Sequence, residues 1–319
     1  MTMNNLSAPA LNVLICTYRR PELLRKALHG IERAAKRMNA VEIIVVDNDA
    51  KLSAQAITTE FSLSTPLKVK YLSQPIQNIS LTRNMALSHA TAPWIALIDD
   101  DEVPDESWLS NLMQTATSYE ADVVFGPVIS EFDQNAPEWA SKGTLFQRPR
   151  FATGFIVPIN QTRTSNVLIR MDRFAKDAFR FDPALGLSGG EDSEFFGRLA
   201  RSGYKMVWCD DACVREMTPL ARTKIAWILK RGFRIGSVDA FNKRRFRQWG
   251  AVARTASKAV VFIGSGIVLS VCLGPFSSKR SVHALFLTAL GAGIFYGIGK
   301  GPYTEYRTPV AKTKGGAAS

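Results

Sequence analysis

Along residues 11–126, short apolar runs alternate with segments in which apolar residues recur every three or four positions. An apolar run of five or six residues is typical of a strand buried on both faces, whereas the wider spacing is typical of an amphipathic helix. The predicted strands are residues 11–16, 41–46, 67–72, 94–98 and 121–125, and the predicted helices are residues 21–38, 53–61, 79–90 and 107–118. This alternation predicts an α/β domain with a mainly parallel sheet.

The pattern weakens in the next part of the chain. Residues 127–165 hold several prolines and glycines, and we expect an irregular segment there. Strands are predicted at residues 166–170 and 204–209, and a helix is predicted at residues 191–201 with Gly203 as its C-cap. We expect these three elements to complete the same domain.

Two long apolar runs lie near the C-terminus. Residues 259–276 contain no charge, and residues 282–299 contain only His283. Each run has 18 residues, which is close to the minimum for spanning a bilayer, and only five residues separate them. Two such runs in tandem predict a membrane hairpin. The alternative is a buried or interfacial pair of helices.

Positive charge is concentrated just before the first of these runs. The chain holds 40 Lys and Arg against 28 Asp and Glu, which gives a net charge of +12. Residues 222–258 alone hold eleven Lys and Arg and one acidic residue, Asp239. Beside a membrane hairpin, this stretch favours anionic lipid headgroups over nucleic acid as its partner. The positive-inside rule places it on the cytoplasmic side.

These patterns divide the chain into five parts. We expect an N-terminal extension (1–10), the α/β domain (11–220), a basic amphipathic helical region (221–258), two hydrophobic helices (259–299) and a flexible tail (300–319). Four Cys in 319 residues are too few for a disulfide framework, and the N-terminus lacks the pattern of a secretory signal. A reducing compartment is therefore expected.

Acidic residues follow two of the predicted strands, where parallel α/β sheets bind their ligands. Asp47 follows residues 41–46, and Asp99, Asp100 and Asp101 follow residues 94–98. Adjacent carboxylates repel one another, and a divalent cation relieves that repulsion. In an extended segment Asp99 and Asp101 point to the same side, so they are predicted to share an ion. The alternative is a solvated acidic turn that caps the following helix.

A third acidic group follows the double glycine at positions 189 and 190. Glu191, Asp192 and Glu194 fall in the first turn of a predicted helix, whose dipole stabilises a carboxylate there. Three acids in four positions exceed the needs of capping. An ionised carboxylate at the mouth of a site can act as a general base toward a hydroxyl, and Asp192 is the candidate.

The usual phosphate-binding loops are absent from the sequence. There is no G-x-x-x-x-G-K-S/T motif, and the first strand is followed by TYRRP instead of G-x-G-x-x-G. A P-loop kinase and a dinucleotide-dependent dehydrogenase are therefore disfavoured. A bound nucleoside diphosphate would have to be neutralised by a metal ion and basic side chains.

Six segments in a fixed order carry a family resemblance: CTYRRPELLRKAL, IIVVDN, LTRNMAL, IALIDDDEVP, TSNVLIR and GGEDSEFFGRL. Together they resemble the inverting glycosyltransferases of family 2, which have the GT-A fold. The likeness is greatest to bacterial exopolysaccharide enzymes of the succinoglycan type, and it covers residues 11 to about 236. It implies transfer of a sugar from a UDP-sugar with Mg²⁺ or Mn²⁺ as cofactor.

The resemblance also implies a role for each matching residue. The implied contacts to the nucleotide sugar are Thr17, Tyr18, Arg19, Asp47, Arg83, Asn84, Asp99, Asp100 and Asn166. The implied metal ligands are Asp101, Asp99 and Glu216, of which Glu216 replaces a histidine found in many members. Asp192 is the implied catalytic base, with Glu191 beside it near the acceptor. Arg222, Arg231 and Arg234 resemble the exopolysaccharide subset, and they either contact a diphosphate or face lipid.

The membrane hairpin suggests that the acceptor is a saccharide linked to polyprenyl pyrophosphate. Anchoring beside a lipid-borne acceptor raises its effective concentration, and the expected location is the cytoplasmic face of the bacterial inner membrane. The alternatives are a family 2 enzyme that acts on lipopolysaccharide or another acceptor, a sugar nucleotidyltransferase, and a non-catalytic sugar or nucleotide binder. The nucleotidyltransferase would need a glycine-rich loop after the first strand, and the presence of Asp101 and Asp192 disfavours the binder.

Overall fold

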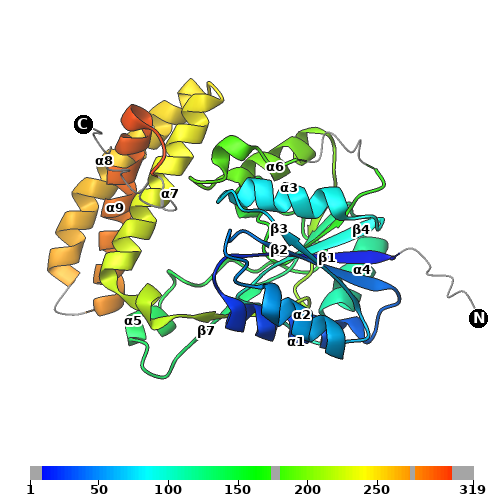
Figure 1. Cartoon of the computed structure of the whole chain (residues 1–319). Helices are drawn as coiled ribbons and strands as arrows, with labels where there is room; N and C mark the ends of the chain where they lie inside the picture. The colour runs from blue at the N-terminus through cyan, green and yellow to red at the C-terminus, as the bar shows by residue number, and fades with distance from the viewer. Residues whose placement is uncertain (1–8, 174–179, 274–276, 304–319) are drawn as a thin grey trace, which may run out of the picture.

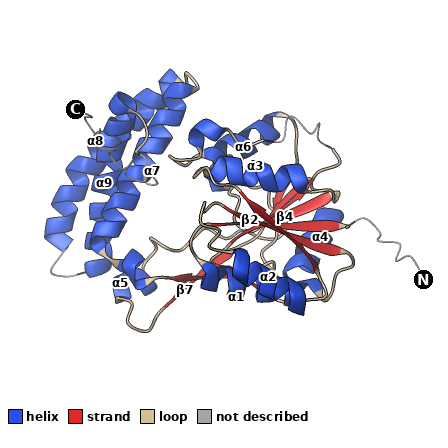
Figure 2. Ribbon diagram, in the orientation of Figure 1, coloured by secondary structure: helices blue, strands red, loops and turns tan. Residues whose placement is uncertain are grey.

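A seven-stranded mixed sheet forms the centre of the N-terminal two thirds of the chain (Figures 1 and 2). The computed structural model describes residues 9–173, 180–273 and 277–303. The strands lie in the order β3-β2-β1-β4-β8-β6-β9. Their bounds are β1 Leu11–Thr17, β2 Val41–Asp47, β3 Lys68–Ser73, β4 Trp94–Asp99, β6 Val123–Phe125, β8 Val167–Arg170 and β9 Met206–Trp208. Only β8 runs antiparallel to its neighbours, so the prediction of a mainly parallel sheet is confirmed.

Helices cover both faces of this sheet. Their bounds are α1 Pro21–Ala35, α2 Gln55–Ser64, α3 Ile79–His89, α4 Trp108–Ser118 and α6 Glu191–Arg201. Val13 and Ile15 of β1 face the core beneath α1, α2 and α4, whereas Leu14 faces the core beneath α3 and α6. Because both faces are covered, the central strands are apolar at nearly every position, and this is why they were recognisable in the sequence.

A second sheet of three strands was not predicted. It consists of β5 Glu102–Pro104, β10 Val214–Thr218 and β7 Val128–Phe132, with β10 in the middle. The prediction that residues 127–165 are irregular is therefore wrong for β7 and for the short helix α5 Glu138–Ser141. Most residues of β7 are only half-buried, so this strand has no continuous apolar run. The remaining short elements are the 3-10 helices η1 Ile159–Gln161, η3 Pro183–Leu185 and η4 Leu220–Thr223.

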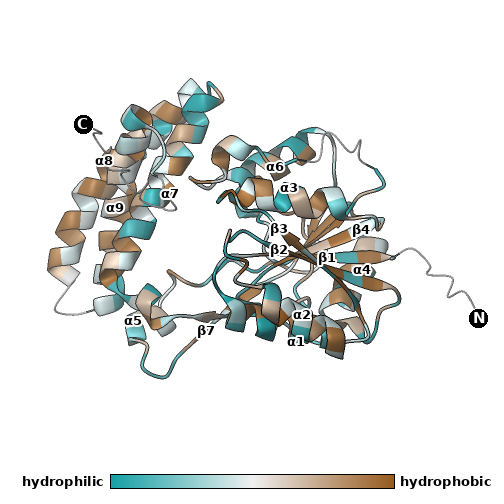
Figure 3. Cartoon of the chain, in the orientation of Figure 1, coloured by the Kyte–Doolittle hydropathy of each residue, from teal (hydrophilic) through white to brown (hydrophobic). Residues whose placement is uncertain are grey.

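The C-terminal part consists of three long helices beside the edge of the sheet at which β1 and β4 end (Figure 1). They are α7 Ile225–Arg245, α8 Trp249–Leu273 and α9 Ser278–Lys300. Two stretches, Trp249–Cys272 and Ser278–Lys300, are long and apolar enough to cross a membrane. Figure 3 shows that α8 and α9 are apolar over most of their length and that α7 carries more polar positions.

Glycines let α7 and α9 approach to backbone contact. A Cβ added at Gly236 would clash with the carbonyl oxygen of Leu290, and one added at Gly297 would clash with that of Ser237. The two helices therefore run side by side in the same direction. On its other side α9 packs against α8, where Gly291 meets the carbonyl oxygen of Ala259. Small residues at such contacts are typical of tightly packed apolar helices.

Candidate functional site

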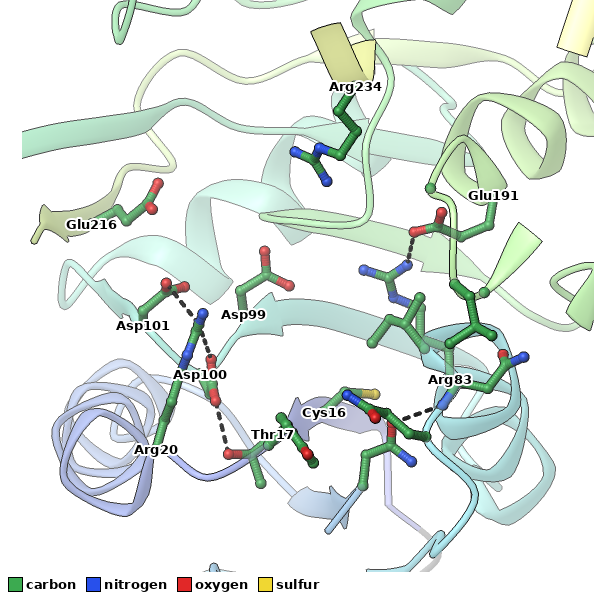
Figure 4. A pocket seen from close by; sticks show the side chains of 18 of the residues that line it. Cys16, Thr17, Arg20, Arg83, Asp99, Asp100, Asp101, Glu191, Glu216 and Arg234 are labelled. Atoms are coloured by element: carbon green, nitrogen blue, oxygen red, sulfur yellow. Dashed lines mark hydrogen bonds and ion pairs between the residues drawn. The ribbon is translucent and has the colours of Figure 1, made fainter. Parts of the chain in front are cut away.

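A pocket of about 370 Å³ opens at the carboxyl ends of β1 and β4 (Figure 4). Thr17 ends β1 and Asp99 ends β4, and both line the pocket. Glu191 at the start of α6 and Arg234 of α7 line it as well. This is the edge at which parallel α/β sheets bind ligands.

Most residues that the resemblance singles out line this pocket. The lining set includes Thr17, Tyr18, Arg83, Asp99, Asp100, Asp101, Glu191 and Glu216. The following are described by the structure but are not part of the lining: Arg19, Asp47, Asn84, Asn166, Asp192 and Arg231. The fold thus gathers residues that lie almost 200 positions apart in the sequence.

The carboxylates after β4 are crowded and buried. Asp100 accepts a hydrogen bond from Thr17 Oγ1 at 2.7 Å, and Arg20 Nη1 lies 3.2 Å from Asp100 Oδ1 and 3.0 Å from Asp101 Oδ2. Burial raises the pKa of Asp99 to about 7; Arg83 opposes this shift and the neighbouring carboxylates add to it. Burial likewise raises the pKa of Asp100 to about 6. The site therefore holds negative charge that a cation would stabilise.

The segment that carries these carboxylates is a turn and not an extended strand. Asp100 and Asp101 form the turn between β4 and β5, and Glu102 accepts a hydrogen bond from the Asp99 backbone N–H at 3.1 Å. The expectation that Asp99 and Asp101 point to one side because they lie in an extended segment is therefore wrong. β5, which follows the turn, pairs antiparallel with β10 in the second sheet, and the side chains of Asp99 and Asp101 both line the pocket.

Arg222 lies between two of the three carboxylates predicted to bind metal, Asp101 and Glu216. Its Nη2 is 3.3 Å from Asp101 Oδ2, and its Nη1 is 2.5 Å from Glu216 Oε1. Arg148 Nη2 lies 3.7 Å from the other oxygen of Glu216. Among the residues that the structure describes, no three His, Cys, Asp or Glu side chains form a group that could hold a metal ion.

The residues present nonetheless suit a hard divalent cation. Oxygen ligands are those preferred by Mg²⁺ and Mn²⁺, and Mg²⁺ usually binds one or two carboxylates and completes its coordination with water and substrate phosphates. Asp101 and Glu216 provide two carboxylates on one side of the pocket, and Asp99 lies nearby (Figure 4). An ion bound to both would have to displace Arg222 from at least one of them.

On the opposite side of the pocket, Arg83 joins the second acidic group. Its Nη1 lies 2.6 Å from Glu191 Oε1 and 3.0 Å from Asp192 Oδ1. Asp192 also accepts hydrogen bonds from the Thr164 backbone N–H at 3.2 Å and from Thr164 Oγ1 at 2.9 Å. Arg83 and Glu191 are buried, while the side chain of Asp192 is 26% exposed. Asp192 is thus the more accessible carboxylate of the pair.

Glu191 has an unusual environment for a carboxylate. Burial raises its pKa to about 7, the charge of Asp192 adds to the shift, and Arg83 opposes it. Within the described residues, its Oε2 is buried without a hydrogen-bond partner. Gly190 before it has φ of 90°, and a Cβ there would clash with Asn242 of α7. The second glycine therefore lets the start of α6 approach α7.

Two of the predicted contacts have structural roles in the interior. Asp47 is buried and accepts hydrogen bonds from the backbone N–H of Asp49 and Ala54, at 2.9 and 2.7 Å, and from the hydroxyl of Tyr71 at 3.0 Å. Asn166 is fully buried, donates to two backbone carbonyls and accepts from Trp108 Nε1 at 2.7 Å. These bonds shape the loops around the pocket, and direct substrate contacts by Asp47 and Asn166 remain predictions.

Two further predicted contacts lie at the border of the site. Asn84 Nδ2 donates to the Phe181 carbonyl and its Oδ1 accepts from the Phe181 backbone N–H, so it fixes the loop that leads to η3. The side chain of Arg19 is 53% exposed and lies 3.2 Å from Asp49. Their roles as nucleotide contacts also remain predictions.

Four arginines besides Arg83 line the pocket: Arg20, Arg148, Arg222 and Arg234. The sequence left the roles of Arg222 and Arg234 open and did not single out the other two. Arg20 could have been found from its position immediately after the first strand. Arg148 had no such signal, because it lies in a segment that shows no regular pattern.

Comparison with known proteins adds an independent result. The model of the glycosyl transferase family 2 matches residues 12–175, and that of the glycosyl transferase family group 2 matches residues 94–298. The chain is 34% identical over 298 residues to the succinoglycan biosynthesis protein ExoM of Rhizobium meliloti (strain 1021), covering 90% of this chain and 92% of that protein.

Solved structures share the fold. A mannosyltransferase of Pyrobaculum calidifontis, solved in complex with GDP-Man and Mn²⁺, aligns with a TM-score of 0.57 and 16% identity over 89% of this chain and 87% of that chain. TarS of S. aureus, solved in complex with UDP-GlcNAc, aligns with a TM-score of 0.51 and 13% identity over 90% of each chain. At these identities the likeness establishes the GT-A fold and does not extend to substrates.

Proposed function

The chain belongs to glycosyltransferase family 2, and on that premise we propose that it transfers a sugar from a UDP-sugar to a saccharide carried by a membrane lipid. The observation that carries this proposal is the pairing of two acidic groups across one pocket. Asp99, Asp100 and Asp101 line one side and Glu191 lines the other, with Asp192 bound to the same arginine as Glu191.

The first acidic group and the arginines beside it would hold the donor. Thr17 and Tyr18 line the pocket at the end of β1, where the nucleoside would lie, and Arg148, Arg222 and Arg234 supply positive charge for its diphosphate. UDP-GlcNAc and GDP-Man are bound by structural neighbours, which supports a nucleotide sugar as donor. We select UDP from the family resemblance of the strand-end residues.

Asp101, Glu216 and Asp99 would hold Mg²⁺ or Mn²⁺ when the donor is bound. Such an ion acts as a Lewis acid that stabilises the departing diphosphate. Arg222, which lies between Asp101 and Glu216, would then be free to turn toward the diphosphate. Bidentate contacts between arginine and phosphate are strong. The metal ion would then balance the charge of the carboxylates, and Arg222 would balance the charge of the diphosphate.

Asp192 would act as the general base. The acceptor hydroxyl gives its proton to the Asp192 carboxylate, the hydroxyl oxygen forms a bond to the anomeric carbon, and the bond from that carbon to the diphosphate breaks. A single displacement of this kind inverts the anomeric configuration. Arg83 and Thr164 hold the Asp192 carboxylate in place, and the start of α6 stabilises it as an anion.

The acceptor is proposed from the C-terminal helices. Two long apolar helices and a strongly basic α7 favour attachment to an anionic membrane surface. A saccharide linked to polyprenyl pyrophosphate at the cytoplasmic face of the bacterial inner membrane fits this arrangement. The relative ExoM is named for succinoglycan biosynthesis, which supports a role in exopolysaccharide synthesis.

The test is transfer of label from a panel of UDP-sugars, with GDP-mannose alongside, into the organic-extractable lipid of membranes that contain the protein. One UDP-sugar should give a lipid product with Mn²⁺, and EDTA should abolish it. A product from GDP-mannose alone would overturn the assignment of UDP. No lipid product with any donor, despite metal-dependent binding of UDP, would overturn the lipid-linked acceptor and direct the search to lipopolysaccharide or other acceptors.

A further inference from the structure

The packing of α9 restricts how the C-terminal helices can meet a membrane. One face of α9 lies against α7 from Val282, which shares a cluster with Ile228, to Ile298, whose carbonyl accepts a hydrogen bond from Arg244. Backbone contacts at Gly236 and Gly297 fix the two helices between these ends. The contact therefore extends along nearly the whole of α9.

The helix that covers α9 is charged and is attached to the catalytic domain. Arg234 of α7 lines the catalytic pocket, and Arg245 Nη2 lies 2.7 Å from Asp182 Oδ2. Asp239 and Lys243 form an ion pair of 2.6 Å on the same helix. If α9 crossed a bilayer, these charges and the adjoining catalytic domain would lie at the depth of the hydrocarbon, where charged groups are strongly disfavoured. This packing is incompatible with a membrane-spanning α9.

The outer face of α8 remains available to lipid. Val260, Val261, Val268 and Val271 are 62%, 62%, 60% and 72% exposed, although they belong to one of the most apolar segments of the chain. α8 contacts α9 through its opposite face, and α8 lies on the side of α9 away from the sheet (Figures 1 and 3). A contiguous exposed apolar face of this kind marks an interaction site.

The charge around this face selects an anionic bilayer as its partner. Residues 249–303, which include α8 and α9, hold five Lys and Arg and no acidic residue, which gives this region a net charge of +5. Exposed basic residues flank the apolar face at both ends: Arg254 and Lys258 on α8, and Lys279 and Arg280 at the start of α9. Basic residues at both ends can meet headgroups of the same leaflet only if the helix lies parallel to the membrane.

We propose that the C-terminal hairpin lies in the plane of the membrane, with the face of α8 formed by Val260, Val261, Val268 and Val271 inserted into one leaflet, and that it does not cross the bilayer. This inference rests on the membrane attachment proposed above and specifies its geometry. Both ends of the hairpin and the catalytic domain then lie on the same side of the membrane.

The arrangement also sets a requirement on the acceptor. Two helix spacings, each roughly 8–10 Å, separate the lipid-facing side of α8 from the pocket wall on α7. The reactive hydroxyl must therefore stand well above the bilayer. An oligosaccharide on a lipid phosphate therefore suits this arrangement better than a single sugar on the same lipid.

Cysteine labelling distinguishes the two topologies. In a Cys272→Ser background, Lys279→Cys reports on the tip of the hairpin, and Ser62→Cys on α2 reports on the catalytic domain; both positions are exposed. A membrane-impermeant maleimide should label both sites in inverted vesicles of a bacterial host and neither in right-side-out vesicles. Labelling of Lys279→Cys in right-side-out vesicles alone would overturn the in-plane hairpin. Absence of the chain from the membrane fraction would overturn the proposed attachment itself.

A second pair of variants tests the lipid-facing side independently of topology and activity. Val261→Asp combined with Val268→Asp should weaken binding of the full chain to phosphatidylcholine vesicles containing phosphatidylglycerol by about tenfold or more. The matched control is Leu63→Asp combined with Ile76→Asp, which adds the same two charges at apolar residues of the catalytic domain that are 85% and 62% exposed, and it should leave binding unchanged. Equal binding of the double variant and the control would overturn the assignment of this face.

Discussion

The two acidic groups of the pocket differ in how firmly their partners hold them. Asp100 and Asp101 pair with Arg20, whose side chain is 42% exposed, and Asp101 also pairs with Arg222, which is 26% exposed. An ion pair whose arginine is accessible to water is screened and is worth less than a fully buried pair. This group can therefore exchange its arginines for a metal ion or a substrate.

The second group is held by a buried partner. Glu191 and Asp192 share Arg83, whose side chain is only 9% exposed. Removing one partner of a buried pair costs about 3–5 kcal/mol, because the other charge is left unpaired. The partners at one side of the pocket are therefore exchangeable and suited to ion binding, while the buried arginine at the other side is suited to positioning a base.

The largest expected effect is on turnover. Asp192→Asn should lower kcat by about 10²–10⁴-fold, because the asparagine cannot take the proton of the acceptor hydroxyl. The measurement is single-donor transfer at saturating Mn²⁺. Glu194→Gln is the matched control, since Glu194 lies in the same helical turn but pairs with Arg198 outside the pocket lining, and it should retain activity. Comparable losses in both variants would contradict the base assignment.

The next effect is on stability. Arg83→Met leaves Glu191 and Asp192 without their shared partner and should destabilise the protein by about 3–5 kcal/mol. For a chain of this size, that corresponds to a fall in melting temperature of about 10 °C. Arg20→Met, at the exchangeable side, should change the melting temperature by no more than a few degrees. If both substitutions lowered it equally, the contrast between the two sides would be lost.

The pH dependence should report on Glu191. Its pKa is raised to about 7, so the ionised form that pairs with Arg83 is present above that pH and is lost below it. Asp99 has a pKa of about 7 as well, but bound Mn²⁺ keeps it ionised. At saturating Mn²⁺, kcat/KM should therefore fall as the pH drops through about 7. Glu191→Gln should have low activity and should not show this fall of kcat/KM at low pH. If the fall is unchanged in this variant, the titration of another group causes it.

The smallest expected effect is on metal affinity. Arg222 occupies the space between Asp101 and Glu216, so Arg222→Met should tighten Mn²⁺ binding in the absence of nucleotide by a few-fold, equivalent to about 1 kcal/mol or less. Calorimetric titration with Mn²⁺ measures this directly. Arg25→Met, which removes an exposed pair with Glu60 on the catalytic domain, is the control and should leave the affinity unchanged. Weaker binding by Arg222→Met would show that Arg222 does not compete with the ion.

The main sheet could be predicted because its central strands are buried on both faces. Residues 94–98 are apolar without interruption, and Asp99, Asp100 and Asp101 directly after them line the pocket at the edge where ligand binding was expected, whereas Asp47 after residues 41–46 does not. The three-stranded sheet escaped prediction because its strands are short, partly exposed and paired across long stretches of sequence. Val128, for example, pairs with Val214, and no local sequence pattern predicts that contact.

The arrangement of the site could be predicted only in part. Acidic residues on strand ends and helix starts stand out in the sequence, but their partners do not, because Arg148 and Arg222 reach the pocket through long-range packing. The turn at Asp100 and Asp101 leads into β5, whose partner β10 is distant in the sequence, so no local pattern indicates it. Likewise, the apolar composition of residues 282–299 suggested a spanning helix, and only the glycine contacts with α7 reveal a charged neighbour along its length.

We propose that one side of the pocket binds the donor through a metal ion and that the other side holds the catalytic base. The most direct test is titration of UDP into the wild type, Asp101→Ala and Asp192→Asn, each with Mn²⁺ and with EDTA. Asp101→Ala should lose the Mn²⁺-dependent part of UDP binding, and Asp192→Asn should retain it. Equal loss of that binding in both variants, or full retention in Asp101→Ala, would contradict this division of roles.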